Sequence, residues 1–346
     1  MSEDVTQQQH GADAVRVGVV GTGAMGAAHV ETLARWVPGA RVVRVFDADL
    51  LRAEEVAADV GATTADSSGA LIDDAEVDAV VIAAPDPLHE ELVLACLEAG
   101  KPTLCEKPLA TSVEGSRRIV DAEVGGGRRL IQVGFMRRYD PAYGELRAAV
   151  LEGAVGPVRA AHCLHRNAQA NPSASSDGVL FNSMIHEFDS VPWLLDDPLS
   201  AVTVYAPKVP DGALQDVQIA VLETAGGVVI TVEVSVNASY GYDIHTEIIG
   251  RDGTISLTPP YGLSLRRANV DGRQVKSDFV ARFVDAYRIE LSAWVRSVRD
   301  GTPPSPSAWD GHLANLTAVA AVESLHGGGR VEVPREDRPA LYGPSA

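Results

Sequence analysis

Three glycines follow an apolar, β-branched run near the start of the chain. Residues 15–20 are Val-Arg-Val-Gly-Val-Val and lead directly into Gly21, Gly23 and Gly26. In a strand, turn and helix with this spacing, the first glycine allows a tight turn, the second admits a pyrophosphate against bare backbone, and the third lets the helix approach the strand. Phosphate would lie at the positive N-terminus of the helix. The pattern predicts a dinucleotide site built from Gly21, Thr22, Gly23, Ala24, Met25 and Gly26.

A carboxylate ends the second predicted strand. Asp47 follows residues 41–46 and lies twenty-one residues beyond Gly26, where a carboxylate can accept hydrogen bonds from both ribose hydroxyls. A 2′-phosphate beside it would meet like charge, at a cost on the order of a few kcal/mol. No arginine immediately follows Asp47, so the pattern favours NAD over NADP. The competing interpretation is a glycine turn that binds no nucleotide, with Asp47 as a helix cap.

Two further side chains could hold or move a proton. Lys107 lies in a Cys-Glu-Lys-Pro-Leu loop after the predicted strand 102–104, at the strand end where doubly wound sheets bind ligands. A residue before proline is extended, and a cis Lys107–Pro108 bond would fix the direction of the lysine. His186 titrates near neutrality, as a proton acceptor for an alcohol must. Asn182 precedes it by four residues, on the same face of a predicted helix.

Taken alone, each of these two groups has an ordinary structural explanation. Lys107 would be a solvated lysine in a surface loop, and His186 would be a helix-face imidazole with a local hydrogen bond. Their occurrence together with the glycine turn favours an active site instead.

The spacing of the histidines does not support a metal centre. Side chains alternate along the predicted strand 158–166, so Cys163 and His165 share one face and His162 lies on the other. His186 also lacks the second histidine, four positions on, that a zinc-binding helix requires. We therefore expect no catalytic metal.

The elements that would position these groups alternate between strands and helices up to about residue 133. This is the pattern of a parallel sheet with helical crossovers. We predict an α/β fold in which residues 15–134 form a Rossmann domain, a doubly wound parallel sheet, after a disordered tail at 1–14. The predicted strands are 15–20, 41–46, 79–83, 102–104 and 130–133, and the predicted helices are 24–36, 48–59, 89–98 and 113–123.

Residues 135–346 predict a second, α+β domain that binds substrate and supports oligomerisation. A helix at 141–152 precedes a series of strands, and the turns at 224–227 and 251–253 predict hairpins, hence an antiparallel sheet. Two late helices, 279–299 and 307–325, would cover this sheet or pack back on the first domain. The predicted strands are 158–166, 201–206, 215–224, 228–237, 242–250 and 254–257.

Composition narrows the possible partners and compartments. The 346 residues include 47 acidic and 29 basic side chains, for a formal net charge of −18. This charge repels phosphate backbones and anionic lipids, so we expect neither nucleic acid nor membrane as a partner. Three scattered cysteines cannot form a disulfide framework, and no apolar run approaches a membrane span. These features favour a cytoplasmic protein.

Several motifs together resemble the glucose-fructose oxidoreductase / inositol dehydrogenase family, and its inositol dehydrogenases most closely. The resemblance implies NAD-dependent oxidation of a secondary hydroxyl of a cyclitol or sugar bound between a Rossmann domain and a domain with a large open antiparallel sheet. That sheet implies a homotetramer or homodimer. The motifs are residues 21–26, Glu106-Lys-Pro108, Gly134-Phe-Met-Arg-Arg-Tyr-Asp-Pro141, His165-Arg-Asn167, Ile185-His-Glu-Phe-Asp189, Tyr240-Gly-Tyr-Asp243 and Trp309-Asp-Gly311.

The resemblance also implies roles for single residues. Lys107 and His186 would act on the substrate hydroxyl, and Glu106 with Lys107 would contact the cofactor. The family's acidic residue four positions before the histidine is Asn182 here, which carries no charge to raise the pKa of the imidazole. Polar groups for a ring of hydroxyls would come from Arg137, His165, Asn167 and Tyr242.

The sequence is also compatible with two other functions. The missing carboxylate at Asn182 would fit a non-catalytic sensor that binds NAD and a sugar. The same chemistry would also serve a biosynthetic reductase of ketocyclitols or amino sugars, because the sequence does not decide the direction of the reaction.

Overall fold

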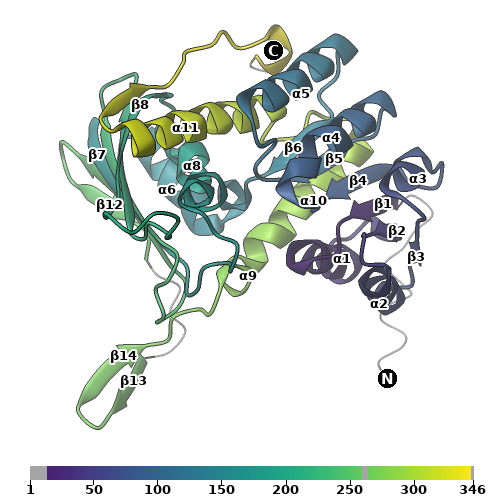
Figure 1. Ribbon diagram of the computed structural model, residues 1–346, viewed down its shortest axis with the longest axis horizontal. Helices are drawn as coiled ribbons and strands as arrows, with labels where there is room; N and C mark the ends of the chain where they lie inside the picture. Colours follow the sequence, from purple (N-terminus) through teal and green to yellow (C-terminus); the bar gives the residue numbers. More distant parts are fainter. Residues whose placement is uncertain (1–13, 259–263, 344–346) are drawn as a thin grey trace. The chain divides into compact units, whose positions relative to one another are not determined.

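The computed structural model describes residues 14–258 and 264–343 (Figure 1). Of the predicted tail at 1–14, only Ala14 lies within the described residues. The chain divides into two compact units. The first comprises the described residues up to Met136 together with 285–315 and 337–343, and the second comprises 137–284 and 316–336.

The first unit contains a six-stranded parallel sheet of order β3-β2-β1-β4-β5-β6. The reversal of strand order beside β1 makes the sheet doubly wound and confirms the predicted fold class. The two-residue strand β3 was not predicted, because it is too short to show a periodicity. The strands are β1 (Val15–Val20), β2 (Ala40–Phe46), β3 (Thr63–Thr64), β4 (Ala79–Ile82), β5 (Thr103–Glu106) and β6 (Ile131–Gly134).

The helices of this sheet begin and end at capping residues. The side chains of Asp49, Ser67 and Ser112 accept hydrogen bonds from the first turns of α2, α3 and α5. Gly61 and Gly127 end α2 and α5 in the left-handed region. The helices are α1 (Ala24–Trp36), α2 (Leu50–Val60), α3 (Ser68–Asp73), α4 (His89–Glu98) and α5 (Val113–Gly126), with the 3-10 turn η1 (Asp86–Leu88).

One late helix belongs to the core of the first unit. Leu291, Trp294 and Val295 of α10 (Val284–Asp300) are buried against Leu33 of α1 and Val45 of β2. The compact units therefore follow a different division from the predicted domains 15–134 and 135–346. The reason is that the apolar face of α10 is buried against the strands and helices of the nucleotide-binding sheet.

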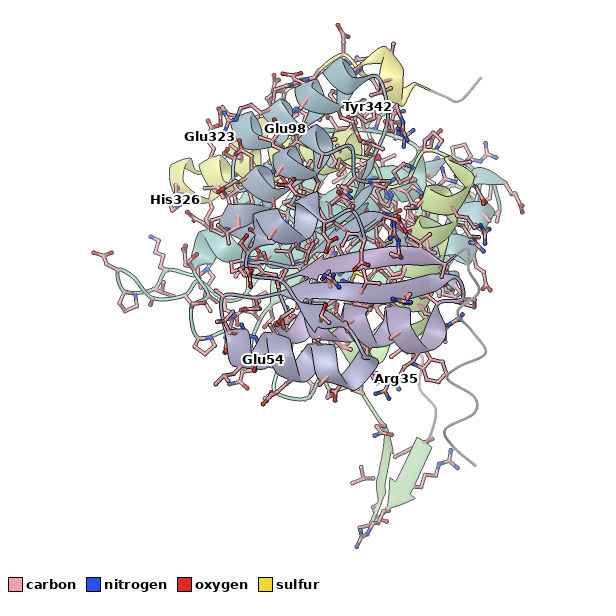
Figure 2. All side chains as sticks on the ribbon, turned by 90° about the vertical axis from the view of Figure 1, so that its right-hand side faces the viewer. Arg35, Glu54, Glu98, Glu323, His326 and Tyr342 are labelled. Atoms are coloured by element: carbon pink, nitrogen blue, oxygen red, sulfur yellow. The ribbon has the colours of Figure 1, made fainter. Side chains whose placement is uncertain are left out.

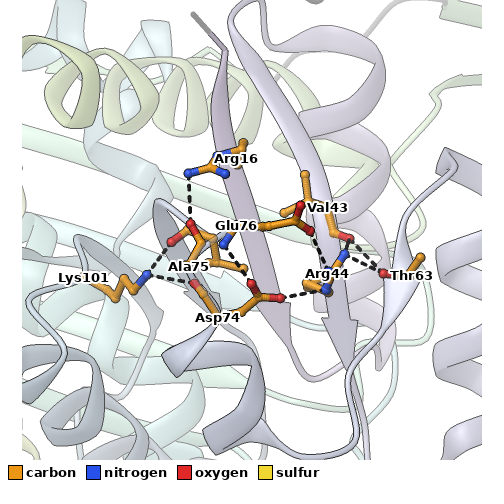
Figure 3. A network of polar contacts seen from close by, with 9 residues as sticks. Arg16, Val43, Arg44, Thr63, Asp74, Ala75, Glu76 and Lys101 are labelled. Carbon is orange, nitrogen blue, oxygen red and sulfur yellow. Dashed lines mark hydrogen bonds and ion pairs between the residues drawn. The ribbon is translucent and has the colours of Figure 1, made fainter.

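Polar contacts surround the amino-terminal end of β1 and the loop that precedes β4 (Figure 3). Arg16 pairs with Asp78, and Arg44 pairs with Asp74 and Glu76. Lys101 donates to the carbonyl of Asp74 at 3.0 Å.

The second unit contains a seven-stranded sheet of order β12-β11-β7-β10-β9-β8-β15. The predicted hairpins at 224–227 and 251–253 are present as the pairs β9–β10 and β11–β12. The strands are β7 (Val158–Arg166), β8 (Leu199–Tyr205), β9 (Gln218–Thr224), β10 (Val229–Ser235), β11 (Asp243–Gly250), β12 (Thr254–Ser256) and β15 (Arg330–Glu332).

One strand pair departs from the predicted antiparallel sheet. β7 and β10 run parallel, while the other neighbouring pairs are antiparallel. The chain leaves β7 through helices and returns through β8 and β9, so β10 arrives beside β7 in the same direction. The sheet is therefore mixed, because adjacency in sequence does not determine which strand β10 pairs with.

Helices of the second unit leave part of the sheet exposed. α6 packs against α8, and the second part of α11 bonds to β8 through Ser324 and the amide of Val204. On the outward face Tyr205, Ile219 and Val229 are 60%, 43% and 45% exposed. The remaining elements are α6 (Pro141–Leu151), α7 (Ser176–Val179), the π-helical turn η3 (Leu180–Met184), α8 (Ile185–Leu195), β13 (Ser264–Arg267), β14 (Val270–Arg273), α9 (Phe279–Arg282) and α11 (Ala308–Gly327), with the 3-10 turns η2 (Met136–Tyr139) and η4 (Ala340–Tyr342).

Acidic side chains lie on the outside of the helices. Glu54 of α2 and Glu98 of α4 are exposed (Figure 2). Near the C-terminus the labelled Tyr342 is buried instead, and its hydroxyl donates to Glu123 of α5. Within residues 14–258 and 264–343, no helix is both long and apolar enough to cross a bilayer.

Candidate functional site

The glycine turn has the geometry that a dinucleotide requires. Gly21 has φ +91°, and a Cβ there would lie 2.4 Å from the carbonyl oxygen of Ala83. A Cβ on Gly26 would lie 1.8 Å from the carbonyl oxygen of Gly21, so helix and turn touch at that point. A Cβ on Gly23 would meet nothing within 4 Å. The open side of the turn is thus at Gly23, at the N-cap of α1.

Asp47 directly follows β2, next to this turn. Its carboxylate accepts hydrogen bonds from the amide of Thr22 at 2.7 Å, from the hydroxyl of Thr22 at 3.1 Å and from the amide of Asp49 at 2.9 Å. Arg52 of α2 donates a further bond at 2.7 Å. Burial opposes ionisation of Asp47, but these hydrogen bonds outweigh it and lower its pKa. The carboxylate is therefore charged and fixed beside the turn.

Arg52 is a functional candidate that the sequence analysis missed. Arg52 does not immediately follow Asp47, but the first turn of α2 brings this residue, five positions beyond Asp47, back to the carboxylate. The contact could have been inferred from the predicted helix at 48–59, because its first turn places residue 52 close to the end of the preceding strand.

Lys107 follows β5, at the carboxyl ends of the strands, as the glycine turn does after β1. The Lys107–Pro108 bond is cis. The preceding residue, Glu106, bonds to Nε2 of His29 through Oε1 at 2.7 Å, and its Oε2 accepts the amide of Lys107 at 3.3 Å. Burial raises the pKa of Glu106, but His29 more than offsets this and leaves the pKa lowered. The backbone of Lys107 is therefore bonded to a carboxylate, that of Glu106, which His29 holds in place.

His186 lies in the second unit, at the start of α8, and is buried. Asn182 lies in the π-helical turn of residues 180–184, which leads directly into the α-helix at Ile185, and a shared face with His186 stays a prediction. Such turns are frequent at functional sites.

A buried ion pair lies next to His165, the histidine whose ring is near that of His186. Arg137 and Glu187 are each 1% exposed and form a salt bridge. Nδ1 of His165 lies 3.3 Å from Oε2 of Glu187 and 3.1 Å from Nη2 of Arg137. The ring of His165 is 6.0 Å from that of His186, centroid to centroid. Glu187 therefore connects two of the predicted site residues, and this role was not predicted.

The charge of Glu187 is set by its neighbours. Burial raises the pKa of the carboxyl, but Arg137 and His165 outweigh it and hold the pKa below its ordinary value. The carboxylate is ionised at neutral pH as a result. The sequence gives no local sign of this pair, because fifty residues separate the partners.

The other two predicted substrate residues lie near the same cluster. The ring of Tyr242 packs edge-on to His165, with centroids 5.8 Å apart, and burial raises the pKa of its hydroxyl. Asn167 donates from Nδ2 to Oγ of Ser183 at 3.3 Å. The second unit thus brings His165, His186 and Tyr242 together, with Asn167 bonded to the π-helical turn.

Side chains on β7 alternate between its two faces as predicted. His162 is exposed on β7, whereas Cys163 and His165 are buried on its other face. In the described part of the chain, no three His, Cys, Asp or Glu side chains are arranged to hold a metal ion. The absence of a catalytic metal stays a prediction.

A glycine turn followed by a fixed aspartate on a doubly wound sheet defines a Rossmann-type nucleotide-binding protein. Family models agree with this class and extend it. Residues 15–135 match the oxidoreductase family with an NAD-binding Rossmann fold, and residues 147–333 match the C-terminal α/β domain of the same family. The chain belongs to this GFO/IDH/MocA oxidoreductase family.

The relatives are similar over nearly their whole length. Inositol 2-dehydrogenase 1 of Saccharopolyspora erythraea is 48% identical and covers 95% of this chain and 99% of its own. Inositol 2-dehydrogenase of Paracoccus denitrificans is 44% identical over the same share of this chain. The crystal structure of myo-inositol dehydrogenase from Lactobacillus casei with NAD(H) and myo-inositol has a TM-score of 0.91 at 37% identity, covering 95% of this chain and 99% of that one.

Proposed function

We propose that the protein is an NAD-dependent inositol dehydrogenase, which oxidises a secondary hydroxyl of a cyclitol to a ketone. The observation that carries the proposal is the combination, in one family member, of the glycine turn, Lys107 and His186. Relatives that are 44% and 48% identical over almost the full chain have the name inositol 2-dehydrogenase, which supports the same substrate class.

Each half of the chain supplies one group to the proposed reaction. His186 accepts the proton of the substrate hydroxyl, and Lys107 donates a hydrogen bond to the same oxygen and polarises it. The glycine turn and Asp47 would hold NAD, which would supply the acceptor for the hydride of the adjacent carbon. The protein contributes position and charge, because the two side chains orient the hydroxyl before the hydride leaves.

Among the proposed substrate residues, Arg137 acts through a neighbour. The guanidinium of Arg137 is held by Glu187 and bonds to His165, so we assign it the positioning of His165. Asn167 is only half-buried and bonds to Ser183. His165, Tyr242 and Asn167 are then the groups proposed to bond the ring hydroxyls, since their side chains combine donors and acceptors.

We also propose that NAD is preferred over NADP. The charged Asp47 suits ribose hydroxyls and repels a 2′-phosphate. Arg52 opposes this preference, because its guanidinium already lies at the carboxylate. Replacing Asp47 with Ser would free Arg52 for the phosphate, so the ratio of kcat/KM for NADP over NAD should rise in Asp47→Ser and fall again in the double variant with Arg52→Ala.

Exposed apolar side chains and buried cysteines bear on the proposed assembly and compartment. The exposed apolar side chains on the open sheet face suit an interface between copies of the chain, so we propose a homotetramer or homodimer. The three cysteines are buried and unlinked, which fits the proposed cytoplasmic location.

An NADH fluorescence assay over inositols, sugars and aminocyclitols tests the function. Wild-type protein should form NADH with a cyclitol, and His186→Ala should lower kcat by at least about a hundredfold while NAD affinity changes little. Near wild-type turnover in His186→Ala would refute the assigned base. NAD and sugar binding without turnover on any substrate would favour the sensor that Asn182 suggests.

A further inference from the structure

His89, which has no part in the proposed reaction, connects the two loops that follow β4 and β5 in the first unit. His89 begins α4 and is 1% exposed. Its Nδ1 lies 2.6 Å from the carbonyl oxygen of Pro108, and its Nε2 lies 2.9 Å from the carbonyl oxygen of Ala84. Each carbonyl can only accept, so the ring serves both loops when both of its nitrogens carry hydrogen.

The two loops held by His89 adjoin the proposed cofactor and substrate groups. Pro108 directly follows Lys107. Ala84 follows β4, next to Ala83, whose carbonyl oxygen lies against Gly21. A single buried ring therefore ties the lysine loop to the backbone that packs against the glycine turn.

A second buried histidine holds the other side of Lys107. His29 of α1 is 1% exposed and bonds to Glu106, whose other oxygen accepts the amide of Lys107. The ring of Tyr287 packs edge-on to His29 with centroids 5.8 Å apart. The backbone is thus anchored to a different helix on each side of the lysine.

We propose that His89, together with His29, is a positioning residue that sets the direction of Lys107. The inference rests on the proposed function, because it concerns the lysine assigned to the substrate hydroxyl. Neither histidine contacts the reacting atoms in this account. Their effect is to restrict the loop from which the ammonium extends, and misplacement of a catalytic group by about 1 Å can cost a hundredfold in rate.

The first test measures hydrogen exchange in the unliganded protein and needs no activity. In His89→Leu, the amides of the non-proline residues in 105–110 and 83–86 should exchange at least about tenfold faster than in wild type, because two anchoring hydrogen bonds are lost. The matched control is His312→Leu. His312 is also buried in the first unit, but its Nδ1 bonds to Ser116 at 2.8 Å, and burial with the nearby Arg117 lowers its pKa to about 4.

The second test uses the active enzyme. His89→Leu should lower kcat by about ten- to a hundredfold and enlarge the deuterium isotope effect on kcat with a cyclitol labelled at the reacting carbon, since hydride transfer becomes slower. His89→Gln, which keeps amide donors, should recover part of kcat. His312→Leu should lower the melting temperature without enlarging the isotope effect.

The outcomes separate this inference from the proposed function. Wild-type protein that oxidises no polyol would refute the function, while the exchange experiment would still decide the positioning role. Unchanged exchange at 105–110 in His89→Leu, or an equal change in His312→Leu, would overturn the inference. If His89→Leu does not fold, His89→Gln and His29→Asn give the same comparison with one donor retained.

Discussion

At the scale of single residues, a buried ion pair lies in the same cluster as the proposed base. Glu187 holds Arg137 and His165 inside the second unit, while in the first unit Asp47 holds the exposed Arg52 beside the glycine turn. The sequence could predict the turn glycines and Asp47, because local spacing determines their geometry. It could not predict Glu187 or His29, since their partners lie far away along the chain.

Glu187→Gln keeps the shape of the side chain and removes its charge. The guanidinium of Arg137 would then be buried without a compensating carboxylate, so we expect a loss of about 3–5 kcal/mol in the free energy of unfolding. Urea denaturation at neutral pH measures this loss. The matched control is Glu233→Gln, which breaks a partly exposed pair with Arg166 and should cost no more than about 1 kcal/mol.

The same pair gives a pH dependence with a definite sign. The pKa of Glu187 is lowered from its ordinary 4.5 in the folded protein, so its contribution to stability is complete above pH 4.5 and is lost as the pH falls through the folded-state value. The difference between wild type and Glu187→Gln should therefore shrink in acid. A difference that stays constant across this range would contradict the assigned ionisation.

Asn182→Asp restores the carboxylate that the family resemblance leads one to expect. On the predicted shared face, a negative charge at residue 182 would raise the pKa of the His186 imidazole. Because the base must be neutral to accept a proton, the acidic limb of the kcat/KM profile should move to higher pH. An unchanged profile would mean that residue 182 is not coupled to His186, and Asn167→Asp serves as the control for a charge elsewhere in the cluster.

At the scale of elements, the strand–turn–helix at the N-terminus was the most predictable part of the fold. Its bounds at 15–20 and 24–36 agree with the structure, because hydrophobic periodicity and glycine spacing are both local. The π-helical turn before α8 and the parallel pair β7–β10 were not predictable in this way. The first replaces an expected helical turn, and the second depends on tertiary pairing.

Two substitutions in the glycine turn should separate binding from folding. Gly23→Ala adds a methyl group to open space, so the protein should fold as wild type but lose at least about tenfold in NAD affinity. Gly26→Ala places a methyl group against the carbonyl of Gly21 and should lower the melting temperature. Fluorescence titration with NADH and thermal denaturation measure the two effects. Equal NAD affinity in Gly23→Ala and wild type would contradict the proposed pyrophosphate position.

At the scale of the whole molecule, a net charge of −18 opposes association of identical chains. The proposed assembly must therefore use apolar contacts. The outward side chains of Tyr205 and Ile219 are cross-strand neighbours on β8 and β9, and both are exposed. Composition predicted the acidic surface, but which sheet face stays uncovered depends on where the helices pack.

A charge on this face should disrupt the assembly. We expect Ile219→Arg to reduce the molar mass measured by light scattering to a smaller assembly or a monomer, because a buried, unpaired guanidinium is costly at an interface. The control is Val270→Arg in β14, where the side chain is 65% exposed and lies outside the seven-stranded sheet. An unchanged mass in Ile219→Arg would place the interface elsewhere.

The most direct test of the central claim is a crystal structure with NAD and myo-inositol bound. We predict one hydroxyl oxygen within hydrogen-bond distance, about 2.6–3.2 Å, of both Nζ of Lys107 and a ring nitrogen of His186. The carbon that bears this hydroxyl should face the nicotinamide of a dinucleotide seated at Gly23. A complex in which the lysine and the histidine contact different groups in separate cavities, or in which the dinucleotide avoids the glycine turn, would contradict it.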